Sequence, residues 1–140
     1  MRRLEEKVLG PDAARSVIAK WRADGVPVVL AIGAFDPLEA ADARDLAALR
    51  PPGARLVVGV SRDDVVATLG AGRPVVPFED RCRVAAALAV VDLVVEAGAD
   101  AVALSRALGL EATAVPGIAR TPDLVSRIRA RLAALRRTSP

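Results

Sequence analysis

The apolar, largely β-branched run from Val26 to Ile32 constrains the fold more than any other segment of the chain. Such a run is typical of a strand that is buried on both faces, as in a parallel sheet covered by helices. It ends at Gly33, and residues 37–49 then repeat apolar side chains at helical spacing. In an open α/β sheet, ligands bind where a strand turns into a helix in this way, because the helix N-terminus offers free N–H groups to anions.

Similar units follow along the chain. We predict further strands at residues 55–60, 92–96 and 111–115. The predicted helices cover residues 10–25, 37–49, 61–69, 77–90, 99–108 and 121–136, with Ser61 as the N-cap of the third and Gly109 closing the fifth. Because strands alternate with helices and crossovers are right-handed, the expected fold is α/β: a Rossmann-like, doubly wound parallel sheet of about five strands in three α/β/α layers.

Length and composition favour one domain. The 140 residues, 53% of them hydrophobic, suffice for a single core, with residues 1–25 as a leading helix and residues 26–140 as the Rossmann-like part. No apolar run reaches the roughly 20 residues of a membrane span, and no signal-peptide pattern follows Met1. We therefore expect a cytoplasmic protein, and the bias toward Ala, Val, Leu and Arg indicates a bacterial source.

The charge pattern argues against nucleic acid as a partner. The net charge is +3, but acidic and basic residues are interspersed and aromatic residues make up only 2%. The chain has no histidine, which excludes Ser-His and Cys-His catalysis and imidazole metal ligands. The single cysteine, Cys82, lies in an apolar-periodic helix, which favours a packed thiol over a nucleophile.

Several separate segments resemble one family of enzymes. Residues 33–42, GAFDPLEAAD, resemble the nucleotidyltransferase pattern Gly-x-Phe-Asp-x-x-His-x-Gly-His. Residues 56–63, LVVGVSRD, are similar to its second strand and Asn-Ser-Asp turn, and residues 72–92 to its Gly-Arg-Pro…Pro-x-x-x-Arg segment. Residues 117–121, GIART, resemble its Ser-Thr-Thr turn. The chain thus resembles the cytidylyltransferase-like superfamily, in particular the adenylyltransferase domain of ADP-heptose synthases and glycerol-3-phosphate cytidylyltransferases.

The resemblance implies a site for a nucleotide, ATP or CTP with Mg²⁺, and for a phosphorylated small molecule. It implies that the nucleotide-binding residues are Gly33, Ala34, Phe35, Asp36, Arg73, Arg81, Gly117, Arg120 and Thr121. Family members often form dimers, so a homodimer or a protein partner is an expectation, whereas a membrane partner is not. Simpler roles remain open: Asp36 and Thr121 could cap helices, and the arginines could be solvated.

The departures from the family pattern concern its catalytic histidines. In the family these imidazoles stabilise charge on the triphosphate, but here their positions hold Glu39 and Asp42, with Ala41 in place of the glycine. A carboxylate about 4 Å from a phosphate charge repels it by ~1 kcal/mol in water and ~4 kcal/mol at an effective dielectric constant near 20. Losing one donor aimed at a developing charge costs roughly a hundred- to a thousandfold in rate.

Two interpretations of this acidic pair are open. Carboxylates are favourable near a helix start for dipole reasons alone. Because Glu39 and Asp42 are three residues apart, they also share a helix face and could hold a Mg²⁺ together with a phosphate.

A second departure lies after Leu108, where the family's lysine-containing Lys-Gly-Gly-Asp-Tyr-like loop is missing. Two functions therefore remain. One is a catalytically impaired nucleotidyltransferase-like domain that binds a nucleotide or phosphorylated ligand in a regulatory or interaction role. The other is an active nucleotidyltransferase that couples a nucleoside triphosphate to a sugar- or polyol-phosphate and releases pyrophosphate.

Overall fold

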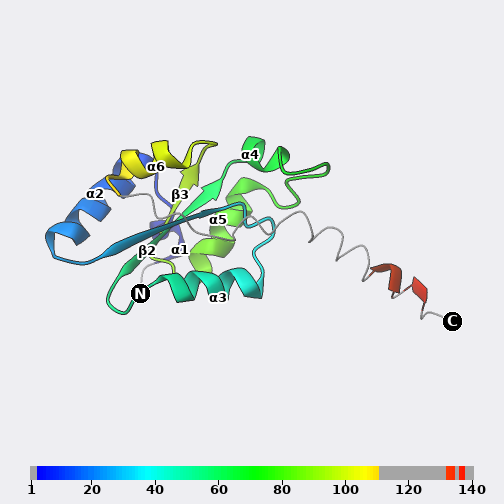
Figure 1. The fold of residues 1–140 in the computed structure, drawn as a ribbon, viewed down its shortest axis with the longest axis horizontal. Coiled ribbons are helices and arrows are strands. Elements are labelled where there is room, and N and C mark those ends of the chain that lie inside the picture. The colour runs from blue at the N-terminus through cyan, green and yellow to red at the C-terminus, as the bar shows by residue number, and fades with distance from the viewer. Residues whose placement is uncertain (1–2, 111–131, 135, 138–140) are drawn as a thin grey trace.

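The computed structural model describes residues 3–110, 132–134 and 136–137 (Figure 1). Its helices and strands alternate as the sequence predicts. In chain order they are α1 (Leu4–Lys7), α2 (Pro11–Ala23), β1 (Val28–Gly33), α3 (Ala40–Leu49), β2 (Arg55–Ser61), α4 (Asp63–Ala67), α5 (Phe78–Ala87), β3 (Leu93–Ala97) and α6 (Ala101–Leu108). Of the predicted final helix, residues 132–134 and 136 are described, and they are helical, as is the next residue, Arg137.

The three strands form one parallel sheet in the order β1-β2-β3. Gly33 pairs with Val60, and Ser61 pairs with Ala97, so the strands end together at one edge, which we name the carboxyl edge. The parallel α/β fold is confirmed. The described strands are fewer than the expected five or so, and the predicted strand 111–115 lies outside the described residues.

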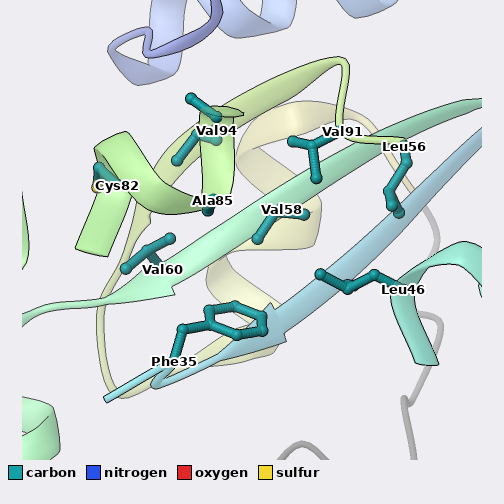
Figure 2. Close-up of a cluster of buried hydrophobic side chains, with 11 residues drawn as sticks. Phe35, Leu46, Leu56, Val58, Val60, Cys82, Ala85, Val91 and Val94 are labelled. Carbon is teal, nitrogen blue, oxygen red and sulfur yellow. The ribbon is translucent and has the colours of Figure 1, made fainter. Parts of the chain in front are cut away.

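Helices cover both faces of the sheet, as Figure 1 shows. Since side chains alternate along a strand, Leu56, Val58 and Val60 face one way while Val57 faces the other. The first face packs against α3 and α5 (Figure 2). Its buried residues include Phe35, Leu46, Leu56, Val58, Val60, Cys82, Ala85, Val91 and Val94.

Cys82 is a packed thiol, as predicted. Its side chain belongs to the first core, and burial raises the pKa of the thiol to about 11 from its ordinary value of 9.0. A thiol that stays protonated near neutral pH is a poor nucleophile.

The opposite face of the sheet packs against α2 and α6. Ile18 and Trp21 of α2 and Leu108 of α6 meet the strand residues Val57 and Val95 there. With helices on both sides, the three α/β/α layers that the sequence predicts are present, and each face of the sheet has its own core.

Two local predictions are wrong. The predicted N-cap Ser61 is the last residue of β2, and Arg62 precedes α4 instead. The leading segment contains a helix that the periodicity did not reveal, because the four residues of α1 are too few to show a pattern. After α1, Val8 forms a parallel bridge to Val94, and the Leu9 N–H donates to the Val94 carbonyl at 3.0 Å. The chain thereby covers the outer edge of β3.

The described helices were compared with the length and hydropathy of a membrane-spanning helix. Within residues 3–110, 132–134 and 136–137, no helix combines the length and the apolar character that a membrane crossing requires.

Gly59 of β2 lies beneath Leu104 of α6, with no room for a side chain between them. A Cβ atom there would lie 3.0 Å from Leu104 Cδ2 and 3.1 Å from Ile32 Cγ1. We expect Gly59→Val to lower the free energy of unfolding by about 1–3 kcal/mol, because it overpacks this layer. Denaturant unfolding measures the change, and Gly98→Val is the matched control, since its nearest neighbour, Arg62 Nη1, lies 3.7 Å away. An equal loss in both variants would contradict the packing described for Gly59.

Candidate functional site

The turn after β1 is strained, and its first aromatic residue is buried. Phe35 takes a φ of +49°, a left-handed conformation that costs a non-glycine residue roughly 1–2 kcal/mol. The residue is only 2% exposed, and its ring packs in the first core (Figure 2). Burial of a phenylalanine contributes about 1.5–3 kcal/mol, which offsets that strain. Packing of Phe35 therefore stabilises the conformation of the turn, which places the backbone of residues 34–36 at the carboxyl edge.

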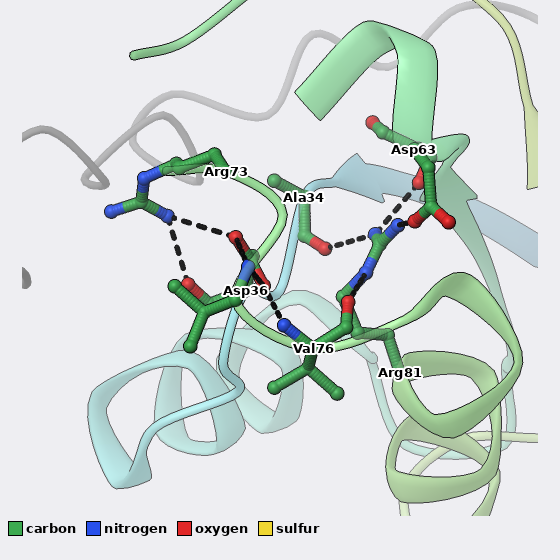
Figure 3. Close-up of polar contacts among 8 residues, drawn as sticks. Ala34, Asp36, Asp63, Arg73, Val76 and Arg81 are labelled. Carbon is green, nitrogen blue, oxygen red and sulfur yellow. Dashed lines mark hydrogen bonds and ion pairs between the residues drawn. The ribbon is translucent and has the colours of Figure 1, made fainter. Parts of the chain in front are cut away.

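Asp36 connects this turn to the loop that precedes α5. Its carboxylate is fully buried and accepts hydrogen bonds from the backbone N–H groups of Val75, at 2.8 Å, and Val76, at 2.7 Å (Figure 3). A helix cap, one of the two roles left open for Asp36, is therefore wrong: α3 begins at Ala40 with Glu39 as its N-cap, and Asp36 binds residues some forty positions away. The carboxylate fixes one loop against the other.

Arg73 supplies the charge that the buried carboxylate needs. Arg73 Nη1 donates to the Asp36 carbonyl oxygen at 2.8 Å, and the same nitrogen lies 3.3 Å from Asp36 Oδ2. The Arg73 side chain is only 3% exposed. A buried carboxylate is stable only when it is paired and hydrogen-bonded, and Asp36 meets both conditions.

Arg81 joins the ends of two strands to the same loop. Its side chain is fully buried and donates to the carbonyl oxygens of Ala34 and Ser61, each at 2.7 Å, and of Val76, at 2.8 Å (Figure 3). Its Nη2 also pairs with Asp63 Oδ1 at 2.7 Å. Since these partners come from the ends of β1 and β2, the start of α4 and the loop before α5, Arg81 fixes the carboxyl edge as one unit.

The burial of both arginines settles one of the alternatives that the sequence left open. Neither Arg73 nor Arg81 is a solvated surface residue. Their described hydrogen bonds go to the protein itself, so both build the edge on which a ligand would lie. Contact of either side chain with a nucleotide phosphate stays a prediction.

Glu39 and Asp42 form a capping box at the start of α3. The Glu39 N–H donates to Asp42 Oδ2 at 2.8 Å, and both residues are half-buried. A capping box requires this spacing of three, so the spacing has a structural explanation without a metal. Within the described part of the chain, no group of three or more His, Cys, Asp or Glu residues could hold a metal ion.

Relatives were found by sequence. No family model matches the chain. Three proteins named "Bifunctional protein HldE" share 44% identity over 91 residues (Magnetococcus marinus), 45% over 93 (Bradyrhizobium diazoefficiens) and 37% over 115 (Rhodospirillum rubrum). These matches cover 64%, 65% and 81% of this chain. They cover 19%, 19% and 22% of the relatives, so the chain spans about a fifth of their length.

Identity at this level, together with the parallel α/β fold, decides the family. The chain belongs to the cytidylyltransferase-like nucleotidyltransferase superfamily. It is a nucleotidyltransferase-related domain. What the full-length relatives do is not thereby shown for this domain, because most of their length has no counterpart here.

The structure brings together most of the residues that the superfamily pattern predicts for nucleotide binding. Gly33, Ala34, Phe35 and Asp36 follow β1, and Arg73 and Arg81 reach them from the loop before α5 and from α5 itself. The other three, Gly117, Arg120 and Thr121, lie outside the described residues.

Sequence reasoning assigned no role to Asp63 or to the backbone of Val75 and Val76. Asp63 was part of the motif that resembles the family's second turn, and that position was the only available signal for its pairing with Arg81. The two backbone N–H groups carry no sequence signal, because any residue other than proline provides one.

Asp36→Asn tests the connection at the carboxyl edge of this nucleotidyltransferase-related domain. The amide cannot balance the buried Arg73 charge, and its NH₂ group cannot accept from Val75 or Val76. Breaking a buried pair in this way costs about 3–5 kcal/mol, so we expect a loss of that size in the free energy of unfolding. Denaturant titration measures it.

Asp64→Asn is the control for this prediction. It also removes a carboxylate paired with an arginine, Arg62, but the Asp64 side chain is 66% exposed. We expect little change in stability, because exposed pairs contribute little. If both variants unfolded at the same denaturant concentration as the unmodified chain, the Asp36 carboxylate would not be what holds the two loops together.

Proposed function

We propose that this domain binds a nucleotide or a phosphorylated small molecule at its carboxyl edge without catalysing nucleotidyl transfer, and that it acts as a regulatory or interaction module. The observation that carries the proposal is the capping box of Glu39 and Asp42, at the two positions where the superfamily pattern has histidines. The binding half rests on the superfamily membership and on the frame built by Asp36, Arg73 and Arg81.

The capping box works against the superfamily reaction in two ways. Two carboxylates replace two donors at the start of α3, and each repels a phosphate at about 4 Å by ~1–4 kcal/mol, depending on the local dielectric. The same carboxylates also take up N–H groups of the helix N-terminus that an anion would otherwise use. Both effects weaken the stabilisation of charge as pyrophosphate leaves.

Ligand binding at the carboxyl edge is supported by the buried contacts that fix the loops there. The backbone of residues 34–36 is held at the carboxyl edge by packing of Phe35 and by the hydrogen bonds of Arg81. Asp36 and Arg73 tie the next loop to it. A frame of this kind positions a ligand with or without catalytic groups, because its rigidity comes from buried hydrogen bonds.

A resident Mg²⁺ between Glu39 and Asp42 fits the described residues poorly. Mg²⁺ requires about six oxygen ligands in near-octahedral geometry. The pair supplies two carboxylates, and one of these already accepts the Glu39 N–H. The active-enzyme alternative would therefore need a metal held mainly by the nucleotide and by water.

Calorimetry with ATP and CTP, each with and without Mg²⁺, tests the proposal together with an assay of pyrophosphate release. We expect saturable binding of at least one nucleotide and no pyrophosphate release with a panel of sugar- and polyol-phosphates. Pyrophosphate release would establish the active alternative. No binding under any of these conditions would refute the binding half.

The variant Glu39→His, Ala41→Gly, Asp42→His restores the family pattern at the start of α3. We expect it to raise triphosphate affinity, since two repelling carboxylates become donors. Calorimetry measures the gain, and circular dichroism verifies that the variant is folded.

Glu39→Gln with Asp42→Asn is the matched control for this variant. It removes the charges but keeps an oxygen acceptor at each capping position, so the expected gain in affinity is smaller than with histidines. If neither folded variant gained affinity, the carboxylates would not be what limits triphosphate binding.

A further inference from the structure

A cavity of about 390 Å³ lies at the amino ends of the strands, away from the carboxyl edge. Its charged and aromatic lining residues are Lys7, Trp21, Arg50, Arg55 and Asp92, and the remaining two are small and apolar. Its volume falls within the roughly 300–1,000 Å³ of pockets that bind small molecules.

The fold places this cavity at the opposite end of the sheet from the turn after β1. Arg55 is the first residue of β2 and pairs with Val28, the first residue of β1. Asp92 immediately precedes β3. Because β2 rises about 3.3 Å per residue, Arg55 and Ser61 at its two ends are roughly 20 Å apart. The cavity is therefore separate from the proposed nucleotide site, and the inference drawn from it does not depend on that proposal.

The lining of the cavity carries more positive than negative charge. Three cationic residues, Lys7, Arg50 and Arg55, line it together with one carboxylate, that of Asp92. Asp92 pairs with Arg55 at 3.0 Å and with Arg50 at 3.4 Å, and it also accepts the N–H of Leu56. One carboxylate balances only one of the three cations, so the lining has an excess of two positive charges.

Helix capping explains only part of this arrangement. Cations are favourable near helix C-termini, and Lys7 donates to the Leu88 carbonyl at the end of α5. An ammonium group has two further donors, and capping does not require three cations to line one cavity. Helix capping also does not explain why Trp21 lines the cavity, with the Arg55 guanidinium 5.5 Å from the centroid of its ring.

We propose that this cavity binds a small phosphate monoester. Such a group carries a charge close to −2 near neutral pH, which matches the excess of positive charge, and arginine and lysine are the usual phosphate-binding side chains. A bare phosphate is only about as large as two or three waters of ~30 Å³ each and would leave most of the cavity unfilled. The organic part of the monoester lies against Trp21 and the apolar Ala89 and Val91.

Trp21 reports on this cavity directly, because it is the only tryptophan in the chain and lines the pocket. Its fluorescence is followed while the full chain is titrated with glucose 6-phosphate, glucose or inorganic phosphate. We expect a saturable change with glucose 6-phosphate, no change with glucose and at least tenfold weaker binding of inorganic phosphate. No saturable change with glucose 6-phosphate or glycerol 3-phosphate would overturn the proposal, and equal affinity for inorganic phosphate would overturn the assignment of an organic group.

Two variants connect the signal to the cavity. Lys7→Gln and Arg50→Gln each remove one cation from the lining, and we expect each to weaken glucose 6-phosphate binding at least tenfold. Arg83→Gln is the control, because Arg83 lies on α5 outside the lining, is 61% exposed and pairs with Asp80. If the control weakened binding as much as the two lining variants, or if neither lining variant weakened it, the site would not be the one proposed.

Discussion

The buried carboxylate of Asp36 is the interaction on which the carboxyl edge depends. It lies in a turn that Phe35 holds by packing, and it binds the backbone of the loop containing Val75 and Val76. Burying a carboxylate is costly unless it is paired, so its position requires Arg73 beside it. Arg81 then joins the ends of β1 and β2 to the same loop. Hydrogen bonds of this kind specify one arrangement of the loops, since each partner lost would leave a buried polar group unsatisfied.

Much of the fold could be predicted from the sequence because burial leaves a periodic pattern. The runs that form β1, β2 and β3 are largely apolar, as is typical of strands covered on both faces. The turn after Gly33 and the left-handed Gly109 at the end of α6 were also readable, since glycine has a specific backbone role there. Two short features could not be predicted. The helix α1 has only four residues, and Ser61 fits the sequence preference for an N-cap although it pairs as a strand residue.

The candidate site was harder to predict than the fold, because an arginine in a sequence does not reveal its partners. Arg73 and Arg81 could equally have been surface residues or phosphate ligands, and their burial depends on backbone groups far away in the chain. For Glu39 and Asp42 the sequence predicts a position near a helix start, which the structure contains, but it is the structure that shows their capping box. The domain thus has an edge built as a nucleotidyltransferase frame, at whose centre two carboxylates stabilise a helix. A cavity with an excess of positive charge in its lining lies at the other end of the sheet.

The central claim is that the frame still receives a nucleotide while the groups for transfer have been replaced. The most direct test uses ¹⁵N-labelled protein with Mg²⁺, a sugar phosphate and either ATP or CTP, observed through its amide signals and through the phosphorus spectrum. Our account predicts that the amide signals of Ala34 and Phe35 shift with at least one of the two nucleotides, while the phosphorus signals remain those of the intact triphosphate. Formation of pyrophosphate, or amide signals at the carboxyl edge that do not move, would contradict it.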